Sequence, residues 1–153
     1  MANANPQTIL LETNGELRPV YNTRIAATAT IIPGMLIEID ANGKVTPVAS
    51  ADKMGTKMIA VEASWADDLT KKAIDTAYAE GDTVSWIYAQ PGDLVYAVVA
   101  ASQTVAIGSA LASSATAGEL TVEASNTDAR IVGLAEEAVT TTGARGRVKL
   151  RII

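Results

Sequence analysis

The amino-acid sequence contains no cysteine, no histidine and no phenylalanine among its 153 residues. The absence of cysteine excludes disulfides, thiol nucleophiles and cysteine-ligated zinc. The absence of histidine removes the most common general base and metal ligand. A core must therefore be built from Ile, Val, Leu and Ala, with Trp65, Trp86 and four tyrosines as the only large rings. We expect a protein that is not an enzyme and that has no metal site and no cofactor.

Positive charge is also scarce, because 12 Lys and Arg residues stand against 17 Asp and Glu residues, which gives a net charge of -5. An acidic balance argues against nucleic-acid binding. No apolar run approaches the roughly 20 residues that a membrane-spanning helix needs, and the first residues lack the basic and apolar regions of a signal peptide. We therefore expect no nucleic-acid partner, no membrane partner and a protein that is used without crossing a membrane.

One pattern occurs twice. In residues 32–46 and 107–121 a glycine precedes a run containing Leu, a polar turn with a second glycine follows, and charged, aliphatic and Thr residues close the pattern. This order is typical of a β-hairpin, and Asn42-Gly43 tolerates positive φ in the first turn. Short echoes follow at residues 59–63 and 132–136. We predict two hairpins within related β units that are joined by a different middle, although any two hairpins share much of this pattern.

Turn signals divide the chain into short strands. Strands are predicted at residues 26–32, 35–39, 44–48, 58–63, 83–88, 94–100, 129–139 and 145–153. The turn at 90–93 predicts that 83–88 and 94–100 form a further hairpin. Residues 65–79 allow either a short helix, because apolar residues recur there at helical spacing, or a long loop with one helical turn. These spacings predict an all-β fold with at most one short helix, as a compact small barrel or sandwich of hairpins.

Residues 1–24 differ from the rest, because Asn, Pro and Gly surround one apolar island, Thr8, Ile9, Leu10 and Leu11. Such a segment cannot form a core of its own. It either frays, as chain ends often do, or it is an extended arm that adds a strand to the exposed sheet edge of a partner. We favour the arm, because three adjacent apolar residues are costly to leave in water. One β-rich domain is expected over residues 25–153.

Four positive charges alternate with apolar residues in the last predicted strand: Arg145, Arg147, Lys149 and Arg151. Successive side chains of a strand point to opposite faces, so all four share one face. Two interpretations remain open. The face is either solvated, or an edge protected by cations, or it makes an electrostatic contact with an acidic partner surface. The four residues are therefore candidate interface residues.

Trp65 and Trp86 are most simply core residues or interface anchors. A carboxylate enzyme would need its acidic groups held together in a cleft. At a subunit interface, such a site would use Glu62, Asp82 and Glu136. Nothing in the spacing brings carboxylates together, so no catalytic site is expected.

The order of these signals resembles that of the head-decoration, or capsid cement, proteins of tailed bacteriophages. The resemblance covers most of the chain from about residue 25, together with the arm. It rests on turn dipeptides and hairpin spacing: Pro33-Gly34, Gly81-Asp82, Pro91-Gly92-Asp93, the Gly108 hairpin, Val132-Gly133-Leu134-Ala135 and the terminal basic strand.

The resemblance implies a small, β-tulip-like, non-enzymatic protein that forms a homotrimer on the exterior of the virion after synthesis in the host cytoplasm. Its partner would be the major capsid protein, and its N-terminal arm would pair with the capsid shell. The apolar island from Thr8 to Leu11 is the only part that corresponds to a contact in that family. The alternative is another β-rich assembly component, such as a phage tail or fibre subunit.

Overall fold

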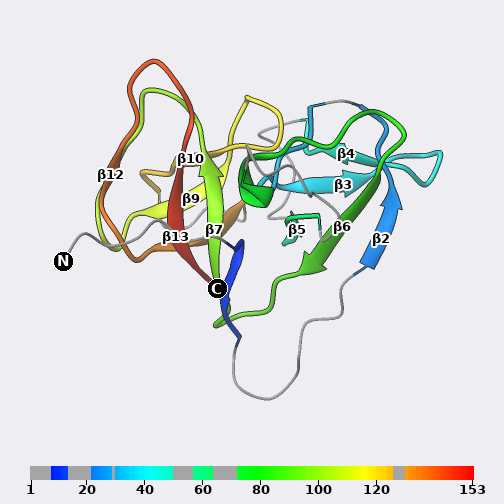
Figure 1. Ribbon diagram of the computed structural model, residues 1–153. Helices are drawn as coiled ribbons and strands as arrows, with labels where there is room; N and C mark the ends of the chain where they lie inside the picture. Colours follow the sequence, from blue (N-terminus) through cyan, green and yellow to red (C-terminus); the bar gives the residue numbers. More distant parts are fainter. Residues whose placement is uncertain (1–7, 14–21, 29, 50–56, 64–71, 126–129) are drawn as a thin grey trace.

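The computed structural model describes residues 8–13, 22–28, 30–49, 57–63, 72–125 and 130–153. These residues form short strands and one turn of 3₁₀ helix, which confirms the all-β prediction. In chain order the elements are β1 (Leu10–Glu12), β2 (Asn22–Ile25), β3 (Ile37–Ile39), β4 (Val45–Pro47), β5 (Met58–Ala60), η1 (Ala73–Asp75), β6 (Thr83–Tyr88), β7 (Leu94–Val99), β8 (Thr104–Val105), β9 (Ala110–Ser113), β10 (Leu120–Val122), β11 (Ile131–Ala135), β12 (Val139–Thr140) and β13 (Gly146–Ile152). Figure 1 shows two lobes side by side, with β7 and β13 in one and β2 to β6 in the other.

Five strands of one lobe form a closed barrel, here called the C-barrel (β7, β9, β10, β11 and β13). Around it the strands follow the order β7-β10-β9-β11-β13, and β13 returns to pair with β7. All pairs are antiparallel except β10–β7, where Leu120 lies beside Val99 in parallel. Alternate residues of each strand face inward, and Val148, Leu150 and Ile152 of β13 are accordingly buried.

The strands of the other lobe follow the same circuit, and we call them the N-barrel (β2, β3, β4, β5 and β6). β2 and β5 pair with the two edges of β6, as β7 and β11 pair with β13, and the β3–β4 hairpin corresponds to β9–β10. Two isolated bridges complete the circuit: Leu36 lies antiparallel to Ile59, and Ala26 lies parallel to Val45. The parallel bridge corresponds to the parallel β10–β7 pair of the C-barrel.

Matching hydrogen bonds place the two barrels in the same register. With the N-barrel first, the corresponding bonds are Gly34 N to Ala60 O (2.8 Å) and Gly108 N to Ala135 O (2.8 Å), Ala60 N to Met35 O (3.0 Å) and Ala135 N to Ser109 O (2.9 Å), and Ala27 N to Val45 O (2.8 Å) and Ala100 N to Leu120 O (2.9 Å). Cross-strand partners agree too, since Trp86 lies opposite Ala60 as Leu150 lies opposite Ala135. The chain is therefore an internal repeat of a five-stranded unit, which is larger than the repeated hairpin that the sequence pattern predicts.

Both predicted hairpins are confirmed, and glycines with positive φ occupy matching positions in them. Gly34 and Gly108 precede the hairpins with φ of 93° and 84°. Gly43 and Gly118 lie in the turns with φ of 74° and 75°. Residues with a side chain rarely adopt these angles, so the glycines fix where each hairpin begins and where it turns.

The two barrels meet along the outer edge of β7. There Tyr96 N donates to Ile9 O (2.7 Å) next to β1, and Val98 N donates to Gly34 O (3.0 Å) in the loop before β3. A Cβ atom on Gly34 would lie 2.7 Å from Tyr96 O, so only glycine allows this approach. One apolar cluster runs from the interior of the C-barrel, through Ile9, to buried residues of β5 and β6. The interior of the N-barrel forms a second cluster.

β6 and β7 lie close to their predicted bounds, but they do not pair with each other. β6 pairs with β2 and β5, while β7 pairs with β1, β10 and β13. The predicted hairpin between them is wrong, because the turn at 90–93 connects the two barrels instead of reversing the chain within one sheet. β6 is thus the last strand of the N-barrel and β7 the first strand of the C-barrel, rather than parts of a separate middle.

Two further expectations change. The strand predicted at residues 26–32 lies earlier, as β2. Of the described residues from 26 to 32, which exclude 29, Ala26 and Ile31 make isolated bridges and the others make none. β2 is mostly polar and exposed, so no apolar alternation marks it as a strand in the sequence. Its first residues lie inside the predicted arm. In the described part of 65–79, residues 72–79, the only helical element is the single turn η1, as the loop alternative predicts. Residues 64–71 lie outside the described residues.

Candidate functional site

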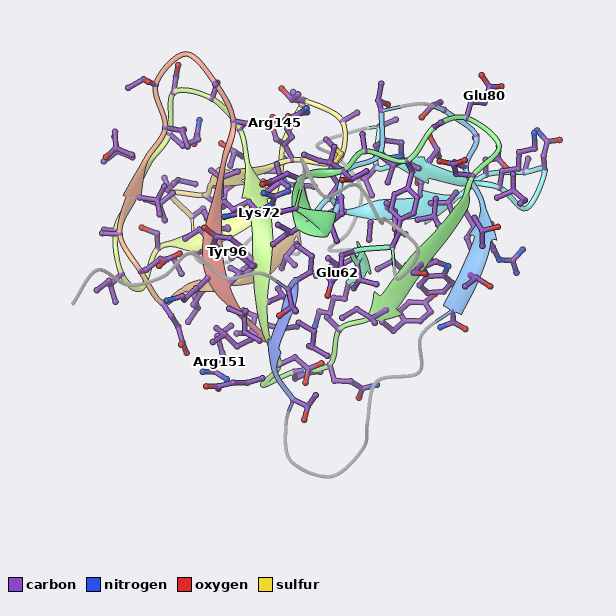
Figure 2. The ribbon with its side chains drawn as sticks, in the orientation of Figure 1. Glu62, Lys72, Glu80, Tyr96, Arg145 and Arg151 are labelled. Atoms are coloured by element: carbon purple, nitrogen blue, oxygen red, sulfur yellow. The ribbon has the colours of Figure 1, made fainter. Side chains whose placement is uncertain are left out.

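The row of four cations lies on the outer face of the C-barrel, along β13 and the residue before it. Figure 2 shows Arg145 and Arg151 toward the two ends of this strand. The predicted alternation is confirmed, because the apolar residues of β13 are buried and the cations are not. The strand is not an edge, since β7 and β11 flank it. The interpretation of the cations as edge protection is therefore wrong.

Every cation of the row is paired with a carboxylate of the same chain. The pairs are Arg145–Glu119 (3.4 Å), Arg147–Asp75 (2.6 Å), Lys149–Glu137 (3.5 Å), Arg151–Glu12 (3.0 Å) and Arg151–Glu136 (2.6 Å). Five carboxylates thus lie against four cations. The row does not present the uncompensated positive charge that complementarity to an acidic partner requires.

Arg147 is the most enclosed residue of the row, with a side chain that is 15% exposed. Its Nη1 donates to Asp75 and its Nη2 donates to Pro33 O (3.2 Å) and to Ile74 O, so it links β13 to segments of the first half of the chain. It lines a cavity of about 320 Å³ beside Tyr96 of β7. Burial, and then the nearby charge of Glu137, raises the pKa of the Tyr96 hydroxyl.

Arg151 connects β13 to β1. Its Nη1 donates to Glu12 of β1 (3.0 Å) and to Gly92 O (2.9 Å), while its Nε donates to Glu136 (2.6 Å). The hydrogen bond from Arg151 lowers the pKa of Glu136, and its two carboxylate partners raise the pKa of the guanidinium. The pairing therefore holds the start of the chain against its last strand.

Residues 8–13 of the predicted arm lie on the C-barrel, whereas residues 22–24 belong to β2 of the N-barrel. β1 pairs antiparallel with β7. Ile9 is fully buried, Leu10 and Leu11 are half-buried, and only Thr8 is exposed. Ile9 N also donates to Glu62 Oε2 (3.0 Å). The expectation of a freely extended arm is wrong for residues 8–13, because the apolar island finds an open sheet edge in its own chain; residues 1–7 and 14–21 lie outside the described residues.

Trp86 belongs to the interior of the N-barrel. It is 4% exposed, and its ring meets the ring of Tyr88 edge to face, with 5.2 Å between centroids. Its Nε1 is buried and has no hydrogen-bond partner within the described structure. Trp86 is therefore a core residue, and the exposed aromatic surface belongs to Tyr88. Trp65 lies outside the described residues.

The carboxylates considered for catalysis serve separate structural contacts. Glu62 accepts from the backbone of Ile9, Asp82 accepts from Ala79 N (2.8 Å) in the turn before β6, and Glu136 accepts from Arg151. Within the described ranges, no three acidic residues lie together as a metal site would require. These contacts close a turn and join strands, and they account for all three side chains.

Sequence reasoning missed the exposed apolar residues of the molecule. Ile107 is 72% exposed, Ile25 43% and Leu134 39%. The alternation in β11 could have placed Leu134 on an outer face. Alignment of the two repeats over their whole length would have shown that Leu134 corresponds to Ile59, which is fully buried.

In the part of the chain that the structure describes, no helix has the length and apolar character needed to cross a membrane. A search against protein-family models finds no match, and no curated protein matches the sequence.

Three features of the described structure are candidate surfaces for binding a partner. They are the edge strand β1, the ion-paired row of cations on β13 and the exposed apolar residues.

Proposed function

We propose that this chain is a structural virion protein that binds the outside of an assembled bacteriophage capsid and stabilises it, as a homotrimer. The observation that carries the proposal is β1, an apolar strand at the end of its sheet. The likeness of the turn and hairpin order to capsid cement proteins supports it. A structural role of this kind needs no catalytic group. It needs a stable β-rich body, here two barrels that meet along β7, and a sheet edge with which a partner strand can pair.

β1 is held to the body and still offers one edge. The buried Ile9 anchors it in the apolar cluster, and the Glu12–Arg151 pair (3.0 Å) fixes its far end. One side of β1 pairs with β7, and among the described residues β1 ends the sheet on the other side, where Thr8 Oγ1 donates to Leu10 O (3.2 Å). A strand of the major capsid protein can add there through main-chain hydrogen bonds, with Leu10 and Leu11 supplying apolar contact.

The stabilising effect follows from mass action. A protein that binds the assembled shell but not its separated subunits shifts the equilibrium toward the shell. At a free concentration one hundred times the dissociation constant, one such site contributes about 2.7 kcal/mol.

The test uses empty expanded shells assembled from the major capsid protein encoded in the same genome. The purified chain should co-sediment with these shells to saturation and raise the temperature at which they dissociate in calorimetry. A Leu10→Asp/Leu11→Asp double variant should lose most of the binding, because both changes place charge along β1.

The control is Ile39→Asp, which places the same charge at an exposed apolar residue far from β1 in the sequence and should bind as the unaltered chain does. Circular dichroism checks that each variant is folded. Absence of co-sedimentation by the unaltered chain would remove the proposed function. Full binding by the folded double variant would remove the role of β1.

A further inference from the structure

The exposed apolar residues of the C-barrel occupy positions that are buried in the N-barrel. Ile107 (72% exposed) and Leu134 (39%) directly precede Gly108 and Ala135, whose backbones are hydrogen-bonded to each other (2.8 Å). Their counterparts in the N-barrel are Pro33, which is buried, and Ile59, which is 0% exposed. The same face of the repeated unit is therefore covered in one barrel and open in the other.

In the N-barrel, β7 of the C-barrel and Ile9, the residue before β1, lie on this face at Gly34, with Ile9 Cδ1 3.3 Å from the place of a Cβ on Gly34. Val98 N donates to Gly34 O (3.0 Å), and a Cγ atom of Val98 lies 3.2 Å from the place of a Cβ on Gly34. Arg147, on the neighbouring strand, donates to Pro33 O. The contact between the barrels is thus made by the outer edge of β7, which lies on Gly34, the glycine that precedes the β3–β4 hairpin.

The repeat supplies a second copy of the covering edge. β2 corresponds to β7, and Ile25 is the residue that corresponds to Val98. Val98 is 1% exposed, whereas Ile25 is 43% exposed, and β2 stands at the end of its three-stranded sheet. Among the described residues, the chain therefore exposes Ile25 of the covering edge on its N-barrel, and Ile107 and Leu134 of the face to be covered on its C-barrel.

The receiving glycine of the C-barrel has the geometry of the one already used. Gly108 has φ of 84°, close to the 93° of Gly34. At Gly108 no atom of the described residues lies within 4 Å of the place that a Cβ would take, whereas the Gly34 site is filled by β7. Arg151 replaces the buried Ile87 at the rim of the open face, and its charge is already matched by Glu12 and Glu136.

We propose that copies of this chain associate head to tail, with β2 of one copy lying on the Ile107–Leu134 face of the next. Ile25 N–H of one copy donates to Gly108 O of its neighbour, as Val98 donates to Gly34 within the chain. A head-to-tail contact of this kind is heterologous, so repeated use closes a ring where the rotation permits it. The contact does not involve the outer edge of β1 and does not rest on capsid binding.

Two single variants test the contact, one on each side of it: Ile25→Asp and Leu134→Asp. Ile39→Asp, which has similar exposure (38%), is the matched control outside the contact. Light scattering after size exclusion, with loading at about 100 µM, gives the mass of each species, and circular dichroism confirms the fold. The unaltered chain and Ile39→Asp should form oligomers, while each contact variant alone should be a monomer.

Mixing the two contact variants gives the decisive result. The Ile25→Asp chain keeps an intact C-barrel face, and the Leu134→Asp chain keeps an intact β2 edge, so one productive contact remains between them. The mixture should yield heterodimers and nothing larger. A monomeric unaltered chain, an Ile25→Asp variant that still assembles, or a mixture that stays monomeric would each overturn the proposal. Capsid co-sedimentation is measured separately, so failure of this contact is distinguishable from failure of capsid binding.

Discussion

The two barrels share strand order, register and hairpin glycines, but their outer faces differ in kind. On the N-barrel, Ile59 and Ile87 lie opposite each other on β5 and β6, and both are fully buried. At the same places the C-barrel carries Leu134, which is partly exposed, and Arg151, which is ion-paired. A strand pairing register is set by the face that must be buried. The two barrels therefore share one strand order and register. Their outer side chains differ according to whether that face of the barrel is buried.

The interiors differ as well, although the same strands build them. The N-barrel encloses Trp86 and Met58, and the corresponding residues of the C-barrel are Leu150 and Gly133. A Cβ atom on Gly133 would overlap the backbone of Arg151, so no larger residue fits there. The C-barrel interior is thus aliphatic, whereas the N-barrel interior also contains the rings of Trp86 and Tyr78.

The largest effects are expected from truncation of corresponding core residues, Ile37→Ala in the N-barrel and Leu111→Ala in the C-barrel. Both side chains are fully buried, so each change should lower the free energy of unfolding by about 2 to 5 kcal/mol. Urea unfolding followed by tryptophan fluorescence and by circular dichroism measures this. Because the barrels share an apolar cluster, Leu111→Ala should move both signals together. A fluorescence transition unmoved by Leu111→Ala would mean that the barrels unfold separately.

The next prediction compares Gly34, where the two barrels meet, with Gly108, its counterpart in the C-barrel. Gly34→Ala and Gly108→Ala both place a side chain at positive φ, at a cost of about 1 to 2 kcal/mol. Only at Gly34 does the new Cβ also meet Tyr96 O, which adds about 1 to 3 kcal/mol of overpacking. Urea unfolding at low micromolar concentration gives the difference between the two variants. Equal losses would show that the approach of β7 to Gly34 does not constrain the fold.

A smaller contrast is expected within the row of cations. Arg147 is 15% exposed and bonds two carbonyls and Asp75, so Arg147→Gln should cost about 1.5 to 3 kcal/mol. Arg145 is 48% exposed and makes one long pair, so Arg145→Gln should cost less than about 1 kcal/mol. Thermal unfolding at low and high salt compares them. If Arg145→Gln proved the more damaging change, Arg147 would not be the link between the halves.

The smallest effect concerns acid. Arg151 lowers the pKa of Glu136 below its ordinary value of 4.5, so the ionised carboxylate contributes to stability above that value. This contribution is lost as the pH falls through the lowered pKa, because the protonated group no longer pairs with Arg151. Melting temperatures between pH 3 and 7 should therefore fall less steeply on the acid side for Glu136→Gln than for the unaltered chain. Superimposable pH profiles would contradict the assignment.

Local patterns predicted the strands better than their partners. The alternation in β13 and the β-branched and aromatic residues of β6 were sufficient to find both strands. The turn at 90–93 has the chemistry of a hairpin turn, yet it joins two barrels, because turn residues report the local backbone and not which edge is available. β2 was missed because three of its four residues are polar: Asn22, Thr23 and Arg24.

The candidate surfaces were harder to predict than the fold. The cation row was found from its period of two, but its neutralisation depends on carboxylates that come from β1, η1 and two loops. No spacing rule brings such distant residues together. The apolar island around Ile9 was also found, and its burial depended on an edge of β7 that only the folded chain reveals.

β1 has a consequence for the order in which the molecule is completed. β1 precedes every strand of the N-barrel in the sequence, but its partner β7 is the first strand of the C-barrel. Leu10 therefore cannot pair with Val95 until the whole N-barrel sequence has been synthesised. Each barrel closes through strands of its own stretch of chain, whereas β1 closes a loop around the whole N-barrel, and contacts of long sequence separation form slowly. The earliest described strand to be made can therefore pair only after the whole N-barrel and β7 have been made.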